Sequence, residues 1–239
     1  MAMRLDKLLS RLGIASRSGC RDLLKAGRVR VDGQACRDGA FSVPEGSEVT
    51  LDGERLDTRM ERHVMLYKPA GVLTAREDRN TRTVMDLLPP VYTSLECMPV
   101  GRLDKDTTGI LLLTTDGELA HRLISPVRHV DKVYEARVDG ALEQADIEKF
   151  AAGIELKDFT ALPAKLEILS DQVGRVTVQE GKYHQVKRMF ASVGKPVEAL
   201  HRLSFGPLPL DENLRPGEYR ELKEEEIAAL YEAAGLKHE

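Results

Sequence analysis

The chain has 239 residues, of which 42% are hydrophobic and 31% are charged, and its formal net charge is −4. It is long enough for one large domain or for a small domain and a larger one. We find no apolar run that could span a membrane, no signal-peptide core, and only three widely spaced cysteines, so we expect a protein of the reducing cytoplasm without disulfides.

The charge is distributed unevenly along the chain. Residues 1–37 contain nine Lys or Arg against three Asp, a net charge of +6, whereas residues 211–239 contain nine acidic residues against four basic ones, a net charge of −5. The acidic total argues against a nucleic-acid binder. A basic head and an acidic tail nevertheless predict that the head contacts a polyanion locally.

The first predicted elements are two short helices. Four leucines in residues 5–12 fall at helical spacing, and Gly13 can end that helix. Ser16 is a suitable N-cap for a second helix that runs to Ala26, and Gly27 can stop it. The sequence therefore predicts a helix pair at the start of the chain.

The second helix carries a row of cations, and a basic hairpin follows it. One face of this helix carries three cations spaced four residues apart, Arg17, Arg21 and Lys25. This face either contacts phosphates or is a solvated face with counter-ions. Cations and valines alternate in residues 28–31, so the valines are expected to be buried and both arginines to face outward. Asp-Gly at 32–33 is a signal for a tight turn.

Two helices followed by a basic hairpin resemble the α-L RNA-binding domain that was first named from ribosomal protein S four. The resemblance implies contact with structured RNA through the helix pair and the hairpin. The domain is predicted at residues 1–57, with a linker at 58–62 and a second domain at 63–239. Its expected RNA-binding cations are Arg17, Arg21, Lys25, Arg28 and Arg30.

The second domain is predicted to contain more strands than helices. A strand at 63–67, a turn at 68–71 and a strand at 72–74 are expected at its start. Many connections are short, which favours an α+β fold with a mixed, mainly antiparallel sheet and flanking helices. The later predicted elements are helices at 118–124, 142–152, 181–193 and 223–234, and strands at 131–138, 164–169, 175–179, 197–205 and 217–222.

Residues 101–109, Gly-Arg-Leu-Asp-Lys-Asp-Thr-Thr-Gly, form a polar loop before the apolar run 110–113. A loop on a rigid strand is a common support for functional side chains. Asp104 lies among cations, which favours an ionised carboxylate that can act as a nucleophile. For an isolated Asp, a solvated salt bridge is the more usual interpretation, and with Asp106 it could suggest a glycosidase pair of carboxylates.

The pattern Gly-Arg-Leu-Asp-x-x-Thr-Thr-Gly at 101–109 resembles the catalytic motif of RNA pseudouridine synthases, specifically the family of the ribosomal small-subunit pseudouridine synthase A. The resemblance covers nearly the whole chain. It implies an isomerase that converts a flipped-out uridine of small-subunit ribosomal RNA to pseudouridine without a cofactor or a metal. The sequence has no Walker loop, no Gly-x-Gly-x-x-Gly and no Cys/His metal cluster, which agrees with such a reaction.

The resemblance also implies roles for single residues. Asp104 is the expected nucleophile, and Lys187, where related families have Arg, would form an ion pair that orients Asp104 and keeps it ionised. Tyr134 would stack on the uracil and assist the proton transfer at C5, although from sequence alone an ordinary half-buried strand tyrosine is the better interpretation. Arg102 would fill the space left by the flipped base or hold the flanking phosphate. Asp106 is a variable position in the family and is interpreted as a surface residue.

A second group of residues is expected around the same site. Val186 would pack under the base, and Lys68 and Pro69 would support the loop that carries Asp104. Arg188 is adjacent to Lys187, so it is a rival for the ion pair and a candidate for contact with RNA. His184 could be read as a general base, but we interpret it as structural.

Two alternatives remain open at this stage. The same chemistry could act on large-subunit ribosomal RNA, or the protein could be a non-catalytic assembly factor that binds ribosomal RNA. Asp104, Tyr134 and Lys187 together favour an enzyme, and the short C-terminal tail favours the small-subunit branch. The expected partner is small-subunit RNA in a partly assembled particle, bound by a monomer that does not contact membranes.

Overall fold

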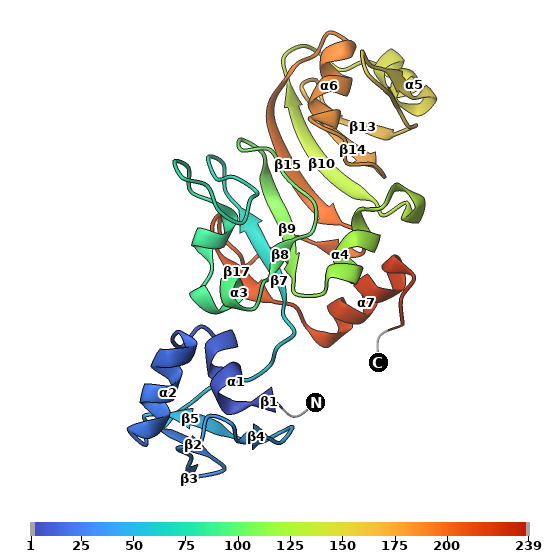
Figure 1. Cartoon of the computed structure of the whole chain (residues 1–239). Coiled ribbons are helices and arrows are strands. Elements are labelled where there is room, and N and C mark those ends of the chain that lie inside the picture. The colour runs from blue at the N-terminus through green and yellow to red at the C-terminus, as the bar shows by residue number, and fades with distance from the viewer. Residues whose placement is uncertain (1–2, 238–239) are drawn as a thin grey trace. The chain divides into compact units, whose positions relative to one another are not determined.

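The computed structural model describes residues 3–237 and divides them into two compact units (Figure 1). The first unit comprises residues 3–62 together with 89–97, and the second comprises residues 63–88 and 98–237. Within residues 3–237, no helix is both long and apolar enough to cross a membrane. The predicted linker at 58–62 stays a prediction.

The first unit contains both predicted helices and the predicted hairpin. The Ser16 hydroxyl accepts a hydrogen bond from the Gly19 N–H at 3.2 Å and caps the second helix. Asp32 and Gly33 have φ of 49° and 78°, the backbone that a tight hairpin turn requires. The elements are β1 (Met3–Arg4), α1 (Leu5–Arg11), α2 (Arg17–Lys25), β2 (Val29–Val31), β3 (Gln34–Ala35), β4 (Ser42–Val43), β5 (Val49–Leu51) and β6 (Glu54–Arg55).

One apolar core holds the first unit together. The leucines of α1 pack against Cys20 and Leu24 of α2 and against the valines of the sheet β3-β2-β5-β6. Val29 and Val31 are buried and Arg30 between them is exposed, so the alternation predicted for this strand is confirmed. Val91, in the short helix α3 (Pro90–Ser94), also packs against this core, which explains why residues 89–97 group with the first unit.

The second unit is built on a nine-stranded sheet in the order β13-β14-β10-β15-β9-β7-β17, with β16 beside β15 and β8 beside β9. Among these described strands, β15 and β9 are paired parallel and the other pairs are antiparallel. The α+β class is therefore confirmed. The strands are β7 (His63–Lys68), β8 (Met98–Pro99), β9 (Thr108–Thr114), β10 (Lys132–Val138), β13 (Lys165–Ser170), β14 (Val173–Val178), β15 (Val197–Phe205), β16 (Leu208–Pro209) and β17 (Tyr219–Glu221), and β11 (Ile154–Glu155) and β12 (Thr160–Ala161) form a separate ribbon.

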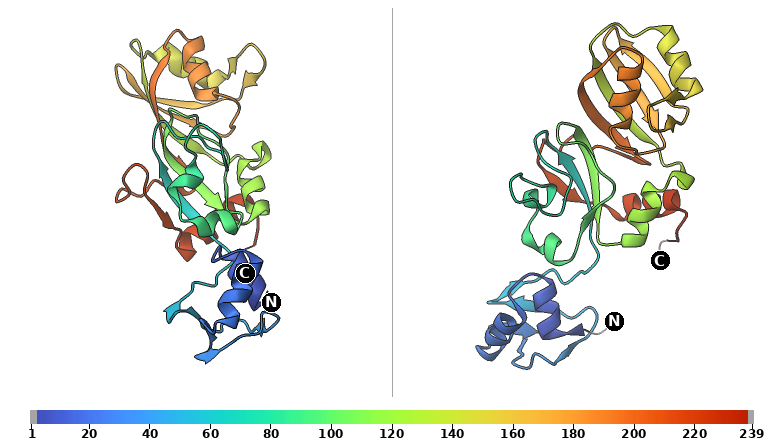
Figure 2. Two further views of the ribbon diagram at one scale, coloured as in Figure 1. Left: turned by 60° about the vertical axis from the view of Figure 1, so that its left-hand side comes forward. Right: turned by 45° about the horizontal axis from the view of Figure 1, so that its top comes forward.

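Helices flank this sheet in two places (Figure 2). Helices α4 (Gly117–Ile124) and α7 (Glu224–Ala234) pack together, and α4 also packs on β9, in a core that includes Ile110 and Leu112. Helix α5 (Gln144–Ala152) packs on β13, and α6 (Gln185–Ser192) packs against β15. The rings of Phe150 and Phe190 join α5 to α6 with centroids 4.8 Å apart. Short 3-10 helices η1 (Val84–Leu87) and η2 (Pro126–Arg128) complete the elements.

Three details of the sequence prediction are wrong. Residues 72–74 form no strand, because Leu73 makes a single bridge to Thr83 and the Thr74 hydroxyl donates to the Leu103 carbonyl instead. The helix predicted from residue 142 begins at 144, because Leu142 N–H donates to Asp171 O at 2.6 Å and keeps the chain extended. The helix predicted from residue 181 begins at Gln185.

Candidate active site

The order of the central strands brings together segments that are far apart in the sequence. The loop at residues 101–107 leads into β9, Tyr134 lies on β10, and Lys187 lies on α6. Strand β15 runs between β9 and β10. The sheet therefore supports the loop on β9 and Tyr134 on β10, on either side of β15, which gives the site a rigid base.

Gly109 allows β9 to approach β15 closely. It is paired with Arg202 in the parallel register, and its φ is +110°. A Cβ at this position would lie 2.2 Å from the Arg202 carbonyl oxygen and 2.6 Å from the Arg202 nitrogen. Backbone atoms cannot yield as a side chain can, so only glycine fits where the loop enters the strand.

Lys68 ties the loop to the end of β7. Its side chain is fully buried, and its Nζ donates to the carbonyls of Pro69 (3.0 Å), Lys105 (3.2 Å) and Thr107 (2.9 Å). Gly71 N–H donates to the Lys105 carbonyl as well, at 2.7 Å. Burial lowers the pKa of Lys68 to about 8. The turn after β7 and the loop at 101–107 are thus fastened to each other by main-chain acceptors.

Lys187 lies between two carboxylates. Its Nζ is 3.3 Å from Asp104 Oδ2 and 2.5 Å from Asp106 Oδ1. The hydrogen bond from Lys187 lowers the pKa of Asp106, whose side chain is 76% exposed, whereas that of Asp104 is 25% exposed. On the other side of Asp104, His184 Nε2 is 3.4 Å from Oδ1. Asp104 is therefore half-buried between two nitrogen groups and still reaches the open pocket.

The pocket in front of Asp104 has a volume of about 60 Å³. Four other residues to which the family resemblance gives a role share it: Arg102, Tyr134, Val186 and Lys187. Lys68 and Pro69 are not among its lining residues. The remaining lining residues are Leu103, Thr107, Val178, Glu180, Gly181, Lys182, His184, Gln185 and Leu200.

Arg188 is directed away from Asp104. Its guanidinium forms an ion pair with Asp158 through both Nη atoms, and this pair lowers the pKa of Asp158. Its Cζ also lies 4.9 Å from the centroid of the Phe159 ring. Of the two neighbouring cations, the structure therefore brings Lys187 to Asp104 and leaves Arg188 at the rim.

Arg202, which no sequence pattern indicated, is 2% exposed. Its Nε donates to the Ile110 carbonyl at 2.8 Å, its Nη1 lies 3.4 Å from the Tyr134 hydroxyl, and its Nη2 has no hydrogen-bond partner. The two residues face each other across β15 and β10. Alternation along β15 places Arg202 on the same side as buried Leu200, and that signal could have identified it.

Buried positive charge extends under this part of the sheet. Lys132 on β10 is 4% exposed and donates to the Gln179 carbonyl at 3.2 Å. Burial is the main cause that lowers the pKa of Lys132 to about 8, and the positive charge of Arg202 lowers it further in the same direction. Lys68, Lys132 and Arg202 hydrogen-bond to carbonyl oxygens, so their charge is not cancelled by a bonded carboxylate and favours an anion nearby.

The cations of the first unit fall into different surroundings. Arg21 and Lys25 line one hollow of about 230 Å³ with Arg4 and Arg37. Arg17 lines another, of about 360 Å³, with Lys7 and Arg11.

The two arginines of the hairpin already have partners. Arg28 forms a double hydrogen bond with Asp52, with distances of 2.8 and 2.5 Å. Arg30 donates to the Gly33 carbonyl at 3.1 Å. On the helix, Arg21 Nε lies 3.6 Å from Asp6 Oδ2, a longer contact than those of the hairpin arginines, so the helix cations have more freedom to meet phosphates.

No three His, Cys, Asp or Glu side chains in residues 3–237 gather closely enough to hold a metal ion.

Comparison with known proteins gives consistent matches. Residues 62–192 match the family model described as RNA pseudouridylate synthase, and residues 3–49 match the S4 domain. An uncharacterised RNA pseudouridine synthase of Bacillus subtilis, YtzG, is 47% identical over 236 residues, which cover 96% of this chain and 99% of that protein. The ribosomal small subunit pseudouridine synthase A of Escherichia coli K12 is 42% identical over 234 residues, 95% of this chain and all of that protein. A crystal structure of a pseudouridylate synthase matches with a TM-score of 0.68 and 35% identity, over 95% of this chain and 99% of that one.

Proposed function

The chain belongs to the RNA pseudouridylate synthase family, and from this premise we propose that it isomerises a specific uridine of small-subunit ribosomal RNA, with Asp104 as the nucleophile. The observation that carries the proposal is the half-buried Asp104 carboxylate, which lies between Lys187 and His184 in a pocket shared with Tyr134. The names of curated relatives as small-subunit enzymes support this choice of substrate.

The reaction needs no redox change. The bond between uracil N1 and ribose C1′ breaks, a bond between uracil C5 and C1′ forms, the hydrogen on C5 leaves as a proton, and N1 takes up a proton, so the product is an isomer. The Asp104 carboxylate supplies the key step, either by bonding to C1′ or by removing the 2′ proton. A uridine in folded RNA must leave the base stack to reach this pocket.

The other pocket residues have complementary roles in the proposal. Lys187 orients the Asp104 carboxylate, and Tyr134 stacks on the uracil while its hydroxyl assists the proton transfer at C5. Val186 packs under the base, and Arg102 fills the vacated stack or holds the flanking phosphate. The buried cations Lys68, Lys132 and Arg202 stabilise negative charge on the detached uracil.

The first unit supplies RNA affinity in this proposal. Its S4 domain match and its exposed helix cations support contact with ribosomal RNA, in a partly assembled small subunit. Because ribosomal RNA is the proposed substrate, we propose that the protein acts in the cytoplasm and that it acts as a monomer.

Tritium release tests the proposal. Small-subunit RNA labelled at uracil C5 is incubated with the wild type, with Asp104→Asn and with the matched control Asp106→Asn, which alters the second, exposed partner of Lys187. We expect release by the wild type, a loss of at least about 10³-fold in Asp104→Asn with RNA affinity nearly unchanged, and release within about threefold of wild type in Asp106→Asn.

The other outcomes are equally informative. Release from large-subunit RNA alone would replace the proposed substrate. No release from either RNA, free or in partly assembled subunits, together with tight binding, would favour the assembly factor. An unfolded Asp104→Asn protein, seen by circular dichroism, would make Asp104 a structural residue.

A further inference from the structure

Tyr183, just before α6, is exposed where large rings are usually buried. Its side chain is 75% exposed, although an aromatic ring gains much from burial. The ring is stacked on that of His184, with centroids 3.8 Å apart and an angle of 18° between the planes. One face of the Tyr183 ring is therefore covered by His184, and an exposed aromatic surface remains.

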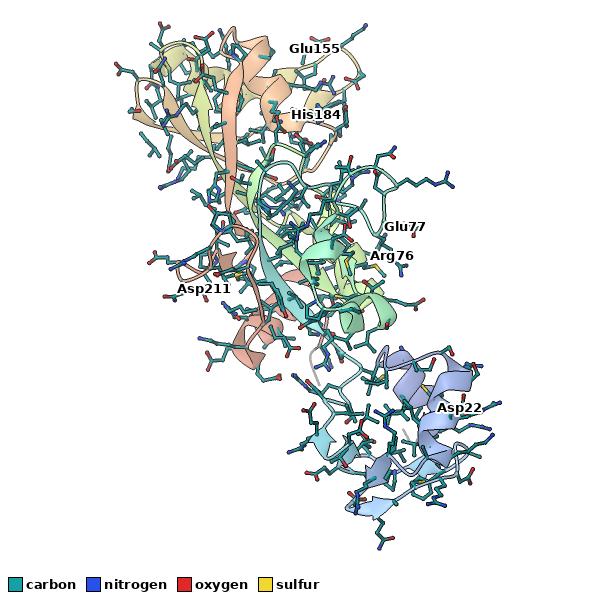
Figure 3. All side chains as sticks on the ribbon, turned by 90° about the vertical axis from the view of Figure 1, so that its left-hand side faces the viewer. Asp22, Arg76, Glu77, Glu155, His184 and Asp211 are labelled. Atoms are coloured by element: carbon teal, nitrogen blue, oxygen red, sulfur yellow. The ribbon has the colours of Figure 1, made fainter. Side chains whose placement is uncertain are left out.

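The backbone holds this stack at a defined place. His184 has φ +49° and ψ +31°, a left-handed conformation that disfavours a side chain with a Cβ. It lies directly before α6, as Figure 3 shows, and its Nε2 is 3.4 Å from Asp104 Oδ1. One face of His184 thus meets Tyr183, and one edge meets the carboxylate that lines the pocket.

Cations border the stack. Lys182, which lines the pocket, has its Nζ 4.2 Å from the centroid of the Phe159 ring and 3.4 Å from Glu180 Oε1. The Arg188 guanidinium, which is paired with Asp158, lies over the same ring. Exposed aromatic rings let proteins bind single-stranded nucleic acid, because the bases stack on them.

We propose that the Tyr183–His184 stack is a platform for the base of a nucleotide next to the modified uridine. This inference rests on the proposed function, since a uridine at Asp104 brings its chain neighbour to the pocket rim. Only one imidazole separates Asp104 from the Tyr183 ring, so a base on Tyr183 lies within one nucleotide step of the pocket. Stacking tolerates any base, so the platform positions the RNA without reading its sequence.

Kinetics test the platform through Tyr183→Leu, which keeps apolar bulk but removes the aromatic face, and through Tyr183→Phe, which keeps the ring. The assay is tritium release from small-subunit RNA. We expect Tyr183→Leu to raise KM about tenfold, with kcat within about twofold of wild type, and Tyr183→Phe to leave both unchanged. Unchanged KM in Tyr183→Leu, or equal effects of Leu and Phe, would overturn the platform and leave the proposed reaction intact.

Fluorescence tests the stacking directly and does not depend on turnover. The chain has no tryptophan, so Tyr183→Trp introduces a single reporter at the platform. Val127→Trp is the matched control, because Val127 is 80% exposed in the same unit. We expect small-subunit RNA to quench the fluorescence of Tyr183→Trp strongly and that of Val127→Trp weakly. Quenching without tritium release would support the platform while the proposed reaction fails, and equal quenching of both proteins would overturn the platform.

Discussion

The two units use positive charge in opposite ways. In the first unit, Arg17 and Arg21 lie on the exposed face of α2 (Figure 3 labels Asp22 on the same helix). In the second, Lys68 and Arg202 are at most 2% exposed and donate to main-chain carbonyls. Exposed cations attract phosphates through electrostatic interactions that salt screens. Buried cations fix a backbone and a local field, so we expect their removal to alter chemistry and stability more than affinity.

The largest expected difference between the two units is the loss of unfolding free energy when a glycine is replaced by alanine. In Gly109→Ala the new methyl would overlap the Arg202 main chain, so we expect a loss of at least about 3 kcal/mol in unfolding free energy. Gly33→Ala in the first unit is the control, since φ is +78° there but no atom lies within 4 Å of the new Cβ, and a loss of about 1 kcal/mol is expected. Denaturant melts measure both, and equal losses would contradict a special role for the β9–β15 approach.

A buried cation can be tested through its effect on turnover. Arg202→Met removes the donor beside the Tyr134 hydroxyl, so we expect kcat to fall by about 10- to 100-fold with KM nearly unchanged. Arg202→Lys keeps the positive charge but not the planar guanidinium with its several N–H donors, so it should recover part of this loss. A raised KM with unchanged kcat would instead place Arg202 in RNA binding.

The second unit should also respond to alkaline pH. Folded Lys68 loses its proton near pH 8, whereas an unfolded lysine keeps it to about pH 10.4. Between these values the unfolded state binds more protons, so the Lys68 contribution to unfolding free energy rises with pH, by about 1–3 kcal/mol from pH 8 to pH 10. The measurement is the difference between wild type and Lys68→Met in urea melts across this window. A difference that does not vary with pH would contradict the buried, shifted lysine.

The smallest effect is expected in the first unit. Charge reversal in Arg17→Glu with Arg21→Glu should weaken RNA binding by about tenfold near 0.1 M salt and flatten its salt dependence by about one unit per lost phosphate contact. Arg28→Gln is the control, because Asp52 already neutralises Arg28. Filter binding over a salt series gives the slopes, and an unchanged slope in the reversed protein would exclude the α2 cations as the RNA face.

Sequence patterns predicted local features well. Leucine spacing and the Ser16 cap define α1 and α2, and the loop at 101–109 was recognised from consecutive residues. Arg202 was not identified, because its importance comes from its contact with the Tyr134 hydroxyl on the neighbouring strand. The two residues are 68 positions apart in the sequence. The strand expected at 72–74 failed for the same reason, since Thr74 hydrogen-bonds to Leu103. Long-range hydrogen bonds decide such cases, and a linear pattern does not contain them.

The parallel pairing of residues 108–109 with 201–202 affects the order of events during synthesis. Most of the first unit consists of residues 3–62, and these residues leave the ribosome long before β15 exists. Pairings between distant segments form slowly and cannot begin until both segments are available. The basic helices can therefore fold while the pocket at Asp104 is still incomplete. The enzyme becomes competent only after nearly all of its sequence has been translated.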